Sequence, residues 1–171
     1  MQCPLLDTRT LEAQAQTGET LGALSERAPT MLVFTRHFGC PFCRQMLTIL
    51  ATRRAGIEAT GVQLALVHMG SEAQAAAFFA SYGLGDLPRF ADPKKKLYAA
   101  FGLKRMRLTE LFRPSFWTKG IAMTRQSSIG LPVGDVFQFA GAFVIFQGRI
   151  VQAIRTTRYS EIPELPKSPD R

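Results

Sequence analysis

The fold of this chain is decided by the stretch MLVFTRHFGCPFC at residues 31–43. Its first four residues form an apolar run that is typical of a short strand buried on both faces. The stretch ends in a C-x-x-C pair, Cys40 and Cys43, and an apolar helical pattern follows directly. A strand that turns into a helix at this point places the first thiol at the N-terminus of the helix. The sequence therefore predicts a thiol pair at a strand–helix junction.

The position of Cys40 favours its ionised form. Unpaired backbone N–H groups and the positive end of the helix dipole stabilise a thiolate at a helix N-terminus. The thiolate is the form that attacks a disulfide or a peroxide. Cys43 lies one helical turn further on and can close a disulfide with Cys40. These features indicate redox chemistry in which Cys40 attacks and Cys43 resolves.

The composition is that of one globular domain. The chain has 171 residues, of which 46% are hydrophobic and 20% charged, so residues 1–171 are expected to form a single domain. The odd count of three cysteines leaves Cys3 without a partner and suggests a reducing compartment. Neither a signal peptide nor an apolar run long enough to span a bilayer is visible. We therefore expect a cytoplasmic protein.

The net charge of +8 raises the question of nucleic-acid binding. No recognition motif accompanies the charge, so a solvated basic face is the simpler interpretation and nucleic acid is not expected as a partner. The basic residues are concentrated in one stretch whose single acidic residue is Glu110: Lys104, Arg105, Arg107, Arg113, Lys119 and Arg125. Trp117 lies in the same stretch and is expected either to pack on the domain or to line a groove.

Hydrophobic periodicity and capping residues predict alternating helices and strands up to a break at residues 103–135. The helix after the cysteines is expected to end near Gly56, and the helix capped by Asp92 to begin at Pro93. The expected elements are a helix at 20–27, strands at 31–35, 62–67 and 87–91, a helix at 72–82, and a hairpin of strands 142–146 and 149–154 around Gln147-Gly148.

This order predicts an α/β domain of thioredoxin-like architecture. Strand–helix–strand units pair in parallel through right-handed crossovers, and the closing hairpin makes the central sheet mixed. The helices then flank that sheet. We expect a core at about residues 30–156, an insertion at 103–135 and a loosely held tail at 157–171.

Several stretches together resemble the AhpC/TSA antioxidant group, in particular its peroxiredoxin-like branch. They occur in order over residues 30–156 and are FTRHFGCPFCR at 34–44, VHMGS at 67–71, FADP at 90–93, YAAFGL at 98–103, and Gly134-Asp135 leading to Gln138 and Gly141. The tetrapeptide CPFC is also similar to that of glutaredoxins. The long insertion argues against a glutaredoxin.

The resemblance implies an antioxidant thiol-disulfide oxidoreductase that reduces a peroxide or a disulfide. It implies an external thiol reductant, such as a thioredoxin or glutathione system, and no cofactor. The chain departs from the Pro-x-x-x-Thr-x-x-Cys pattern of true peroxiredoxins in either register. If Cys43 is the matched cysteine, Arg36 and Cys40 replace the Pro and the Thr, whereas matching Cys40 gives Val33 and His37. The first register would make Cys43 the attacking thiol, so both assignments stay open.

Three other residues near the strand ends are candidates for a role. Arg36 would lower the pKa of the thiols if it points toward them, or lies in solvent as strand-end arginines often do. His37 can act as an acid or a base for the thiol, or lie at the surface. His68 is expected to be a buried strand-end residue. A zinc site needs about four ligands, and only Cys3 and His37 could join the pair, so no metal is expected.

Two other functions remain open at this stage. A redox-switched binding module would use the same disulfide to alter a surface that engages an acidic partner through the basic insertion, with little turnover. A thioredoxin-fold scaffold would have no catalytic cysteine. The sequence also leaves open whether the chain forms a homo-oligomer.

Overall fold

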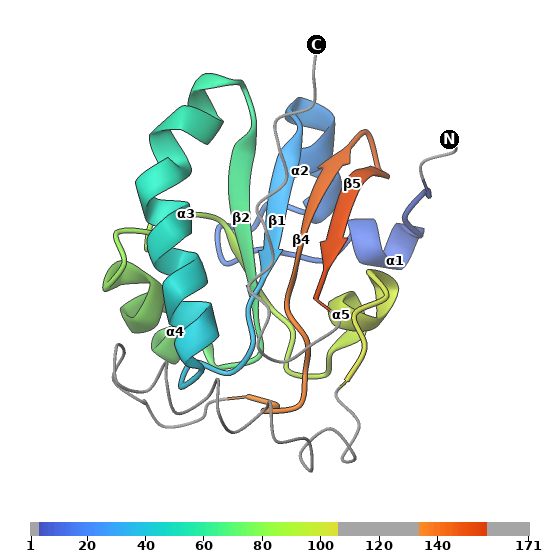
Figure 1. Cartoon of the computed structure of the whole chain (residues 1–171). Coiled ribbons are helices and arrows are strands. Elements are labelled where there is room, and N and C mark those ends of the chain that lie inside the picture. Colours follow the sequence, from blue (N-terminus) through green and yellow to red (C-terminus); the bar gives the residue numbers. More distant parts are fainter. Residues whose placement is uncertain (1–3, 106–133, 157–171) are drawn as a thin grey trace.

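In the computed structural model, which describes residues 4–105 and 134–156, five strands form one mixed sheet (Figure 1). Their order across the sheet is β3-β2-β1-β4-β5. The first three strands run parallel, and the last two pair antiparallel with their neighbours. The predicted α/β architecture with a mixed sheet and a closing hairpin is thereby confirmed. The strands are β1 (Thr30–Phe34), β2 (Gln63–His68), β3 (Arg89–Ala91), β4 (Gly141–Phe146) and β5 (Arg149–Arg155).

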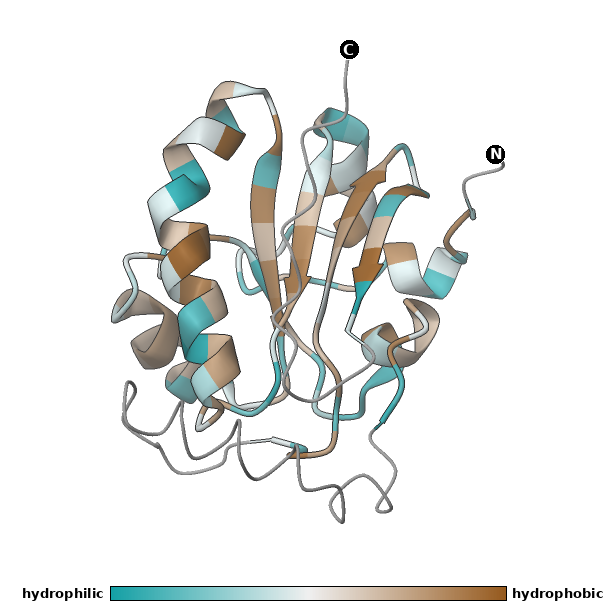
Figure 2. Ribbon diagram, viewed as in Figure 1, coloured by the Kyte–Doolittle hydropathy of each residue, from teal (hydrophilic) through white to brown (hydrophobic). Residues whose placement is uncertain are grey.

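The central strand β1 is buried along its whole length. Its side chains alternate between the two faces of the sheet, so Leu32 and Phe34 join one hydrophobic core while Met31 and Val33 join the other. A strand that is covered on both faces favours apolar residues on both sides, which explains the apolar run at residues 31–34. Figure 2 shows the same hydrophobic character along β1 and its neighbours.

Helices cover both faces of the sheet (Figure 1). One face packs against α3 (Pro41–Ala59) and α4 (Glu72–Ala80), and the other against α1 (Thr8–Leu11), α2 (Leu21–Arg27) and α5 (Lys96–Ala100). The short helix α1 was not expected from the sequence, because four residues are too few to show a periodic pattern. No helix within residues 4–105 and 134–156 is long and apolar enough to cross a membrane.

The end of α3 differs from the prediction. The helix continues through Gly56 and ends at Ala59, so the expected end at Gly56 is wrong. A single glycine is tolerated in a helix at the cost of some stability. The chain instead leaves the helix at Gly61, whose φ of +83° favours glycine.

The start of α5 also differs. The helix begins at Lys96 rather than at Pro93. Its N-cap residue is Lys95, so the predicted N-cap at Asp92 is wrong. Asp92 still supplies a capping carboxylate from three residues further upstream, which accepts hydrogen bonds from the backbone N–H groups of Lys96 and Leu97 at 2.8 and 2.7 Å.

The closing hairpin matches the prediction. Gln147 and Gly148 form its two-residue turn with φ of +48° and +68°, the conformation that suits the twist of antiparallel strands. Of the predicted insertion, only residues 103–105 and 134–135 are described. Trp117 and the basic residues beyond Arg105 lie outside the described residues, as do Cys3 and the tail at 157–171.

Candidate active site

Cys40 and Cys43 lie where β1 leads into α3. Cys40 is the N-cap residue of α3 and Pro41 occupies the first helical position. Both cysteines are free thiols, with 0% and 2% of their surface exposed. Cys40 makes no side-chain capping hydrogen bond. The backbone N–H groups of Phe42 and Cys43 in the first turn of the helix nevertheless help to lower the pKa of Cys40.

The two thiols have opposite acidities. A hydrogen bond from the Cys43 thiol, together with the charge of Arg36, lowers the pKa of Cys40 to about 6 in spite of its burial. Burial and the neighbouring Cys40 sulfur raise the pKa of Cys43 well above its ordinary value. At neutral pH, Cys40 is therefore a thiolate and Cys43 a protonated thiol that donates to it.

Arg36 is buried beside the thiol pair. Only 1% of its surface is exposed, which excludes the solvent-exposed alternative. Its Nη1 atom lies 3.9 Å from the Cys40 sulfur, and its guanidinium group lies over the Phe42 ring at 5.6 Å from the centroid. Its backbone N–H donates a hydrogen bond to the Cys43 sulfur at 3.0 Å. Arg36 therefore contacts one sulfur through its side chain and the other through its backbone.

His37 is also buried, with 8% of its surface exposed, so the expected surface position is wrong. Burial and the positive charge of Arg36 lower the pKa of His37 to about 4, and the opposing charge of Asp135 reduces the effect. The ring is neutral at pH 7. It cannot act as a cationic acid, and the lowered pKa also makes it a weak base.

The segment that follows the insertion reaches the same site. A Cβ built on Gly134 would lie 3.1 Å from the Met69 side chain and 3.6 Å from the His37 backbone. Asp135 accepts from Lys95 at 2.6 Å and pairs with Arg105 at 2.8 Å. A glycine allows this close approach, and the two cations hold the neighbouring carboxylate in place. The sequence suggested no role for this ion-pair cluster.

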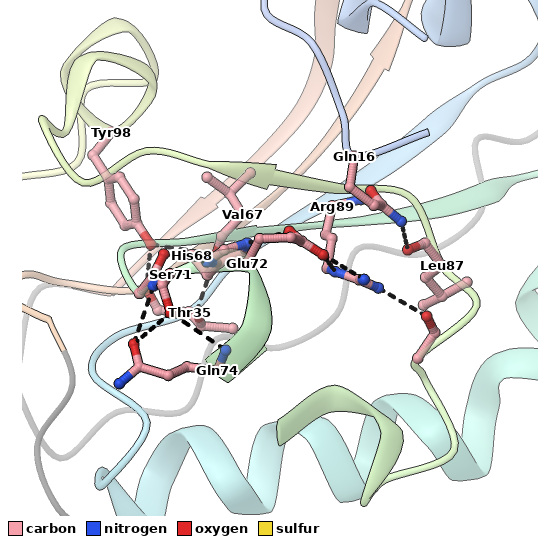
Figure 3. A network of polar contacts seen from close by, with 12 residues as sticks. Gln16, Thr35, Val67, His68, Ser71, Glu72, Gln74, Leu87, Arg89 and Tyr98 are labelled. Atoms are coloured by element: carbon pink, nitrogen blue, oxygen red, sulfur yellow. Dashed lines mark hydrogen bonds and ion pairs between the residues drawn. The ribbon is translucent and has the colours of Figure 1, made fainter. Parts of the chain in front are cut away.

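Tyr98 is a second residue whose place at the site the sequence did not reveal. Its side chain reaches from α5 to the ends of β1 and β2, where the hydroxyl donates to the carbonyl oxygens of Thr35 at 2.6 Å and Val67 at 3.3 Å (Figure 3). Thr35 and Tyr98 are 63 positions apart. No local pattern predicts such a contact. Tyr98 is, however, the first residue of the stretch YAAFGL at 98–103, which resembles the AhpC/TSA group.

His68 lies at the end of β2 and is fully buried, as the sequence predicted. Its Nε2 atom is 3.8 Å from the Glu72 carboxylate, which also accepts from Arg89 at 2.7 Å. Figure 3 shows these three residues side by side. Burial lowers the pKa of His68. Its ring lies 6.0 Å from that of Phe38, which belongs to the loop that carries the cysteines.

In the part of the chain that the structure describes, no group of three or more His, Cys, Asp or Glu side chains could hold a metal ion. A mixed sheet flanked by helices, with a C-x-x-C pair opening the first long helix after the central strand, defines a thioredoxin-fold protein with a dithiol site. A family model for the AhpC/TSA antioxidant enzymes matches residues 50–157, so this chain belongs to that family. The match begins after the two cysteines, and the dithiol itself lies outside it.

Known proteins agree with this assignment. A prostamide/prostaglandin F synthase of Salmo salar is 27% identical over 147 residues, which is 82% of this chain and 72% of the relative. The bacterioferritin comigratory protein of Xanthomonas campestris, described for its alkyl peroxide reduction activity, has a similar structure with a TM-score of 0.65 and 17% identity. The alignment covers 93% of this chain and 90% of that protein. Peroxidoxin BcpB of Mycobacterium tuberculosis gives a TM-score of 0.59 at 17% identity and the same coverage. These structural similarities support the thioredoxin fold.

Proposed function

We propose that this protein is a peroxiredoxin-like thiol-disulfide oxidoreductase in which Cys40 attacks a peroxide or a disulfide and Cys43 resolves the product. The observation that carries the proposal is the contact of Arg36 with both sulfurs, through Nη1 to Cys40 at 3.9 Å and through the backbone N–H to Cys43 at 3.0 Å. The opposite pKa shifts of the two thiols support it. A low-pKa nucleophile beside a protonated partner is the state that a dithiol needs before attack.

With a peroxide, the Cys40 thiolate attacks one oxygen and the O–O bond breaks. The other oxygen leaves as hydroxide or alkoxide and takes a proton from the surrounding water to give water or an alcohol, and Cys40 becomes a sulfenic acid. The Cys43 sulfur then attacks the Cys40 sulfur and loses its proton, and the hydroxide leaves as water. With a disulfide substrate, Cys40 forms a mixed disulfide and Cys43 displaces the substrate thiol. An external thiol donor, such as a thioredoxin or glutathione system, reduces the Cys40–Cys43 bond and is itself oxidised.

Arg36 and His37 have separate roles in this proposal. The Arg36 guanidinium group, 3.9 Å from the Cys40 sulfur, stabilises the thiolate and the negative charge on the departing oxygen. His37, neutral at pH 7, accepts a hydrogen bond from an incoming peroxide and so orients it. The alkyl peroxide reduction described for the Xanthomonas protein makes an organic hydroperoxide a natural first substrate to test.

Single cysteine variants test the assignment. We expect Cys40→Ser to abolish consumption of hydrogen peroxide, of cumene hydroperoxide and of insulin disulfides, because it removes the nucleophile. Cys43→Ser should consume about one equivalent of peroxide and then stop, because the sulfenic acid cannot be resolved. Stopped-flow assays of the pre-reduced proteins without added thiol would measure the single equivalent, and assays with a thioredoxin system would measure turnover.

The pH dependence provides a second check. The wild-type rate constant for the first turnover should rise about tenfold per pH unit below pH 6 and level off above it, since Cys40 ionises with a pKa of about 6. If Cys43→Ser were the inactive variant and Cys40→Ser the one that reacts once, Cys43 would be the nucleophile. Wild-type inactivity with all three substrates would contradict the proposed enzyme. A reversible redox change in partner affinity would then favour the binding module.

A further inference from the structure

We propose that Tyr98 is a positioning residue for the thiol pair: its hydroxyl orients the Thr35–Arg36 peptide so that the Arg36 N–H binds the Cys43 sulfur and directs the Cys43 thiol at Cys40. This inference rests on the proposed function, because it assigns a role within the same dithiol site. Tyr98 comes from α5, on the other face of the sheet from α3, and its role therefore depends on the tertiary fold.

The two hydrogen bonds lie on opposite sides of one peptide unit. The Thr35 carbonyl accepts from the Tyr98 hydroxyl at 2.6 Å, and the Arg36 N–H donates to the Cys43 sulfur at 3.0 Å. A peptide unit is planar, so a partner that fixes the carbonyl direction also fixes the N–H direction. A strong bond to the carbonyl also polarises the N–H and strengthens its own bond. Tyr98 thus acts on Cys43 without touching it.

Tyr98 is held in place through its ring, its backbone and its hydroxyl, and Figure 3 shows the hydroxyl beside Thr35 and Val67. The side chain is 1% exposed, and its ring packs edge-on against Phe34 at 5.0 Å. Its backbone N–H donates to the Asp92 carboxylate at 3.2 Å. The Val67 carbonyl lies at 3.3 Å and already accepts from the Thr35 backbone and hydroxyl at 3.0 Å. The shorter bond to the Thr35 carbonyl is therefore the one that determines the orientation of the peptide.

The effect on chemistry passes through Cys43. When the Cys43 sulfur accepts the Arg36 N–H, the sulfur is fixed in place and its own proton is available for the Cys40 sulfur. The neighbouring Cys43 thiol is the main cause of the lowered pKa of Cys40. Loss of the Tyr98 hydroxyl removes the hydrogen bond to the Thr35 carbonyl and should thereby weaken the bond from the Arg36 N–H to the Cys43 sulfur. The charge of Arg36 and the N–H groups of the first turn of α3 stay in place.

The test is Tyr98→Phe, which removes one oxygen and keeps the ring. Titration of the thiolate absorbance at 240 nm in the reduced protein, between pH 4.5 and 8, measures the pKa of Cys40 without any turnover. We expect the variant to raise that pKa by about half a unit, a roughly threefold lower thiolate-to-thiol ratio at a given pH below the midpoint. Ser25→Ala is the matched control. This substitution also removes a buried hydroxyl, which donates to the Gly22 carbonyl in α2. It should leave the pKa of Cys40 unchanged.

The outcomes separate a positioning role from a structural one. If Tyr98 only contributes to stability, both variants lower the unfolding midpoint and neither moves the pKa of Cys40, and the inference is overturned. A shift in Tyr98→Phe alone supports it. Because the titration needs no substrate, a shifted pKa in a protein that turns over nothing would keep the inference and contradict the proposed function. Normal turnover of the wild type, with no change in the pKa of Cys40 in Tyr98→Phe, would overturn the inference and leave the proposed function in place.

A second measurement covers the case in which Tyr98→Phe does not fold. The amide proton of Arg36 in the reduced protein should have a downfield NMR shift because it is bonded to sulfur. We expect this signal to move upfield in Cys43→Ala, and partly upfield in Tyr98→Phe when that variant folds. An Arg36 amide shift that is the same with and without the Cys43 sulfur would overturn the inference.

Discussion

At the scale of single residues, the site depends on a buried charge pair. Arg36 and the Cys40 sulfur are 1% and 0% exposed, and a charge at such depth is tolerated only beside an opposite charge or strong hydrogen bonds. The thiolate supplies the negative charge, and the Phe42 ring lies against the guanidinium group. The charge of Arg36 therefore makes the ionised state of Cys40 more favourable.

This pairing predicts the effect of removing the guanidinium group. Arg36→Met should raise the pKa of Cys40 by about one unit, which lowers the thiolate fraction, and hence the peroxide rate constant at pH 5.5, about tenfold. Arg44→Met is the matched control, because Arg44 carries the same charge on α3 but lies over the Phe78 ring. Stopped-flow measurement of the rate constant for peroxide reduction at pH 5.5 in both variants would test this prediction. Equal losses in both variants would mean that general positive charge, rather than contact with Cys40, sets the reactivity.

At the scale of elements, α3 shows how a helix can continue past a weak position. Gly56 has ordinary helical φ and open space where a Cβ would be, so no packing or backbone requirement favours glycine there. Gly61, two residues after the helix, also has open space but a φ of +83°. The same substitution at these two glycines should therefore have opposite effects on stability.

We expect Gly56→Ala to raise the free energy of unfolding by about 0.5–1 kcal/mol, because alanine restricts the unfolded chain and favours the helix. Gly61→Ala should lower it by about 1 kcal/mol through strain at positive φ. Urea unfolding followed by circular dichroism measures both changes. Destabilisation by Gly56→Ala would show that the helix does not continue through this position in solution.

At the scale of the whole molecule, two buried histidines make the fold sensitive to acid. Burial lowers the pKa of His37 to about 4 and also lowers that of His68. The unfolded chain, with histidines near 6.5, binds protons that the folded chain does not bind. Stability is therefore fully present above pH 6.5 and decreases as the pH falls toward 4. The pKa of Asp86 and of Asp135 is lowered from 3.8, so these groups titrate below this range.

The prediction is a fall in the urea midpoint between pH 6.5 and 4.5. The unfolded state should take up as much as about one more proton per histidine than the folded state. His37→Gln and His68→Gln should each reduce the slope of the urea midpoint against pH. The series is best measured in the Cys40→Ser background, because the thiolate otherwise titrates near pH 6. A flat profile from pH 6.5 to 4.5 would contradict the burial of both rings.

The sequence predicted most of the sheet because local signals coincide with the elements. The apolar run of β1 and the turn at Gln147-Gly148 each depend on neighbouring residues alone. The site was only partly predictable. The thiol pair follows from its spacing, but the burial of His37 and the reach of Tyr98 to the ends of the strands depend on segments far apart in the chain, for which no local pattern exists.

The turn at residues 60–61 has a practical consequence. It is exposed and lies at the opposite end of α3 from Cys40. The 19 residues of that helix place the two ends about 28 Å apart. A fluorophore or an affinity tag attached at Thr60 would be too far away to shield the sulfurs. The protein can therefore be immobilised or tracked through this turn while its thiols are titrated.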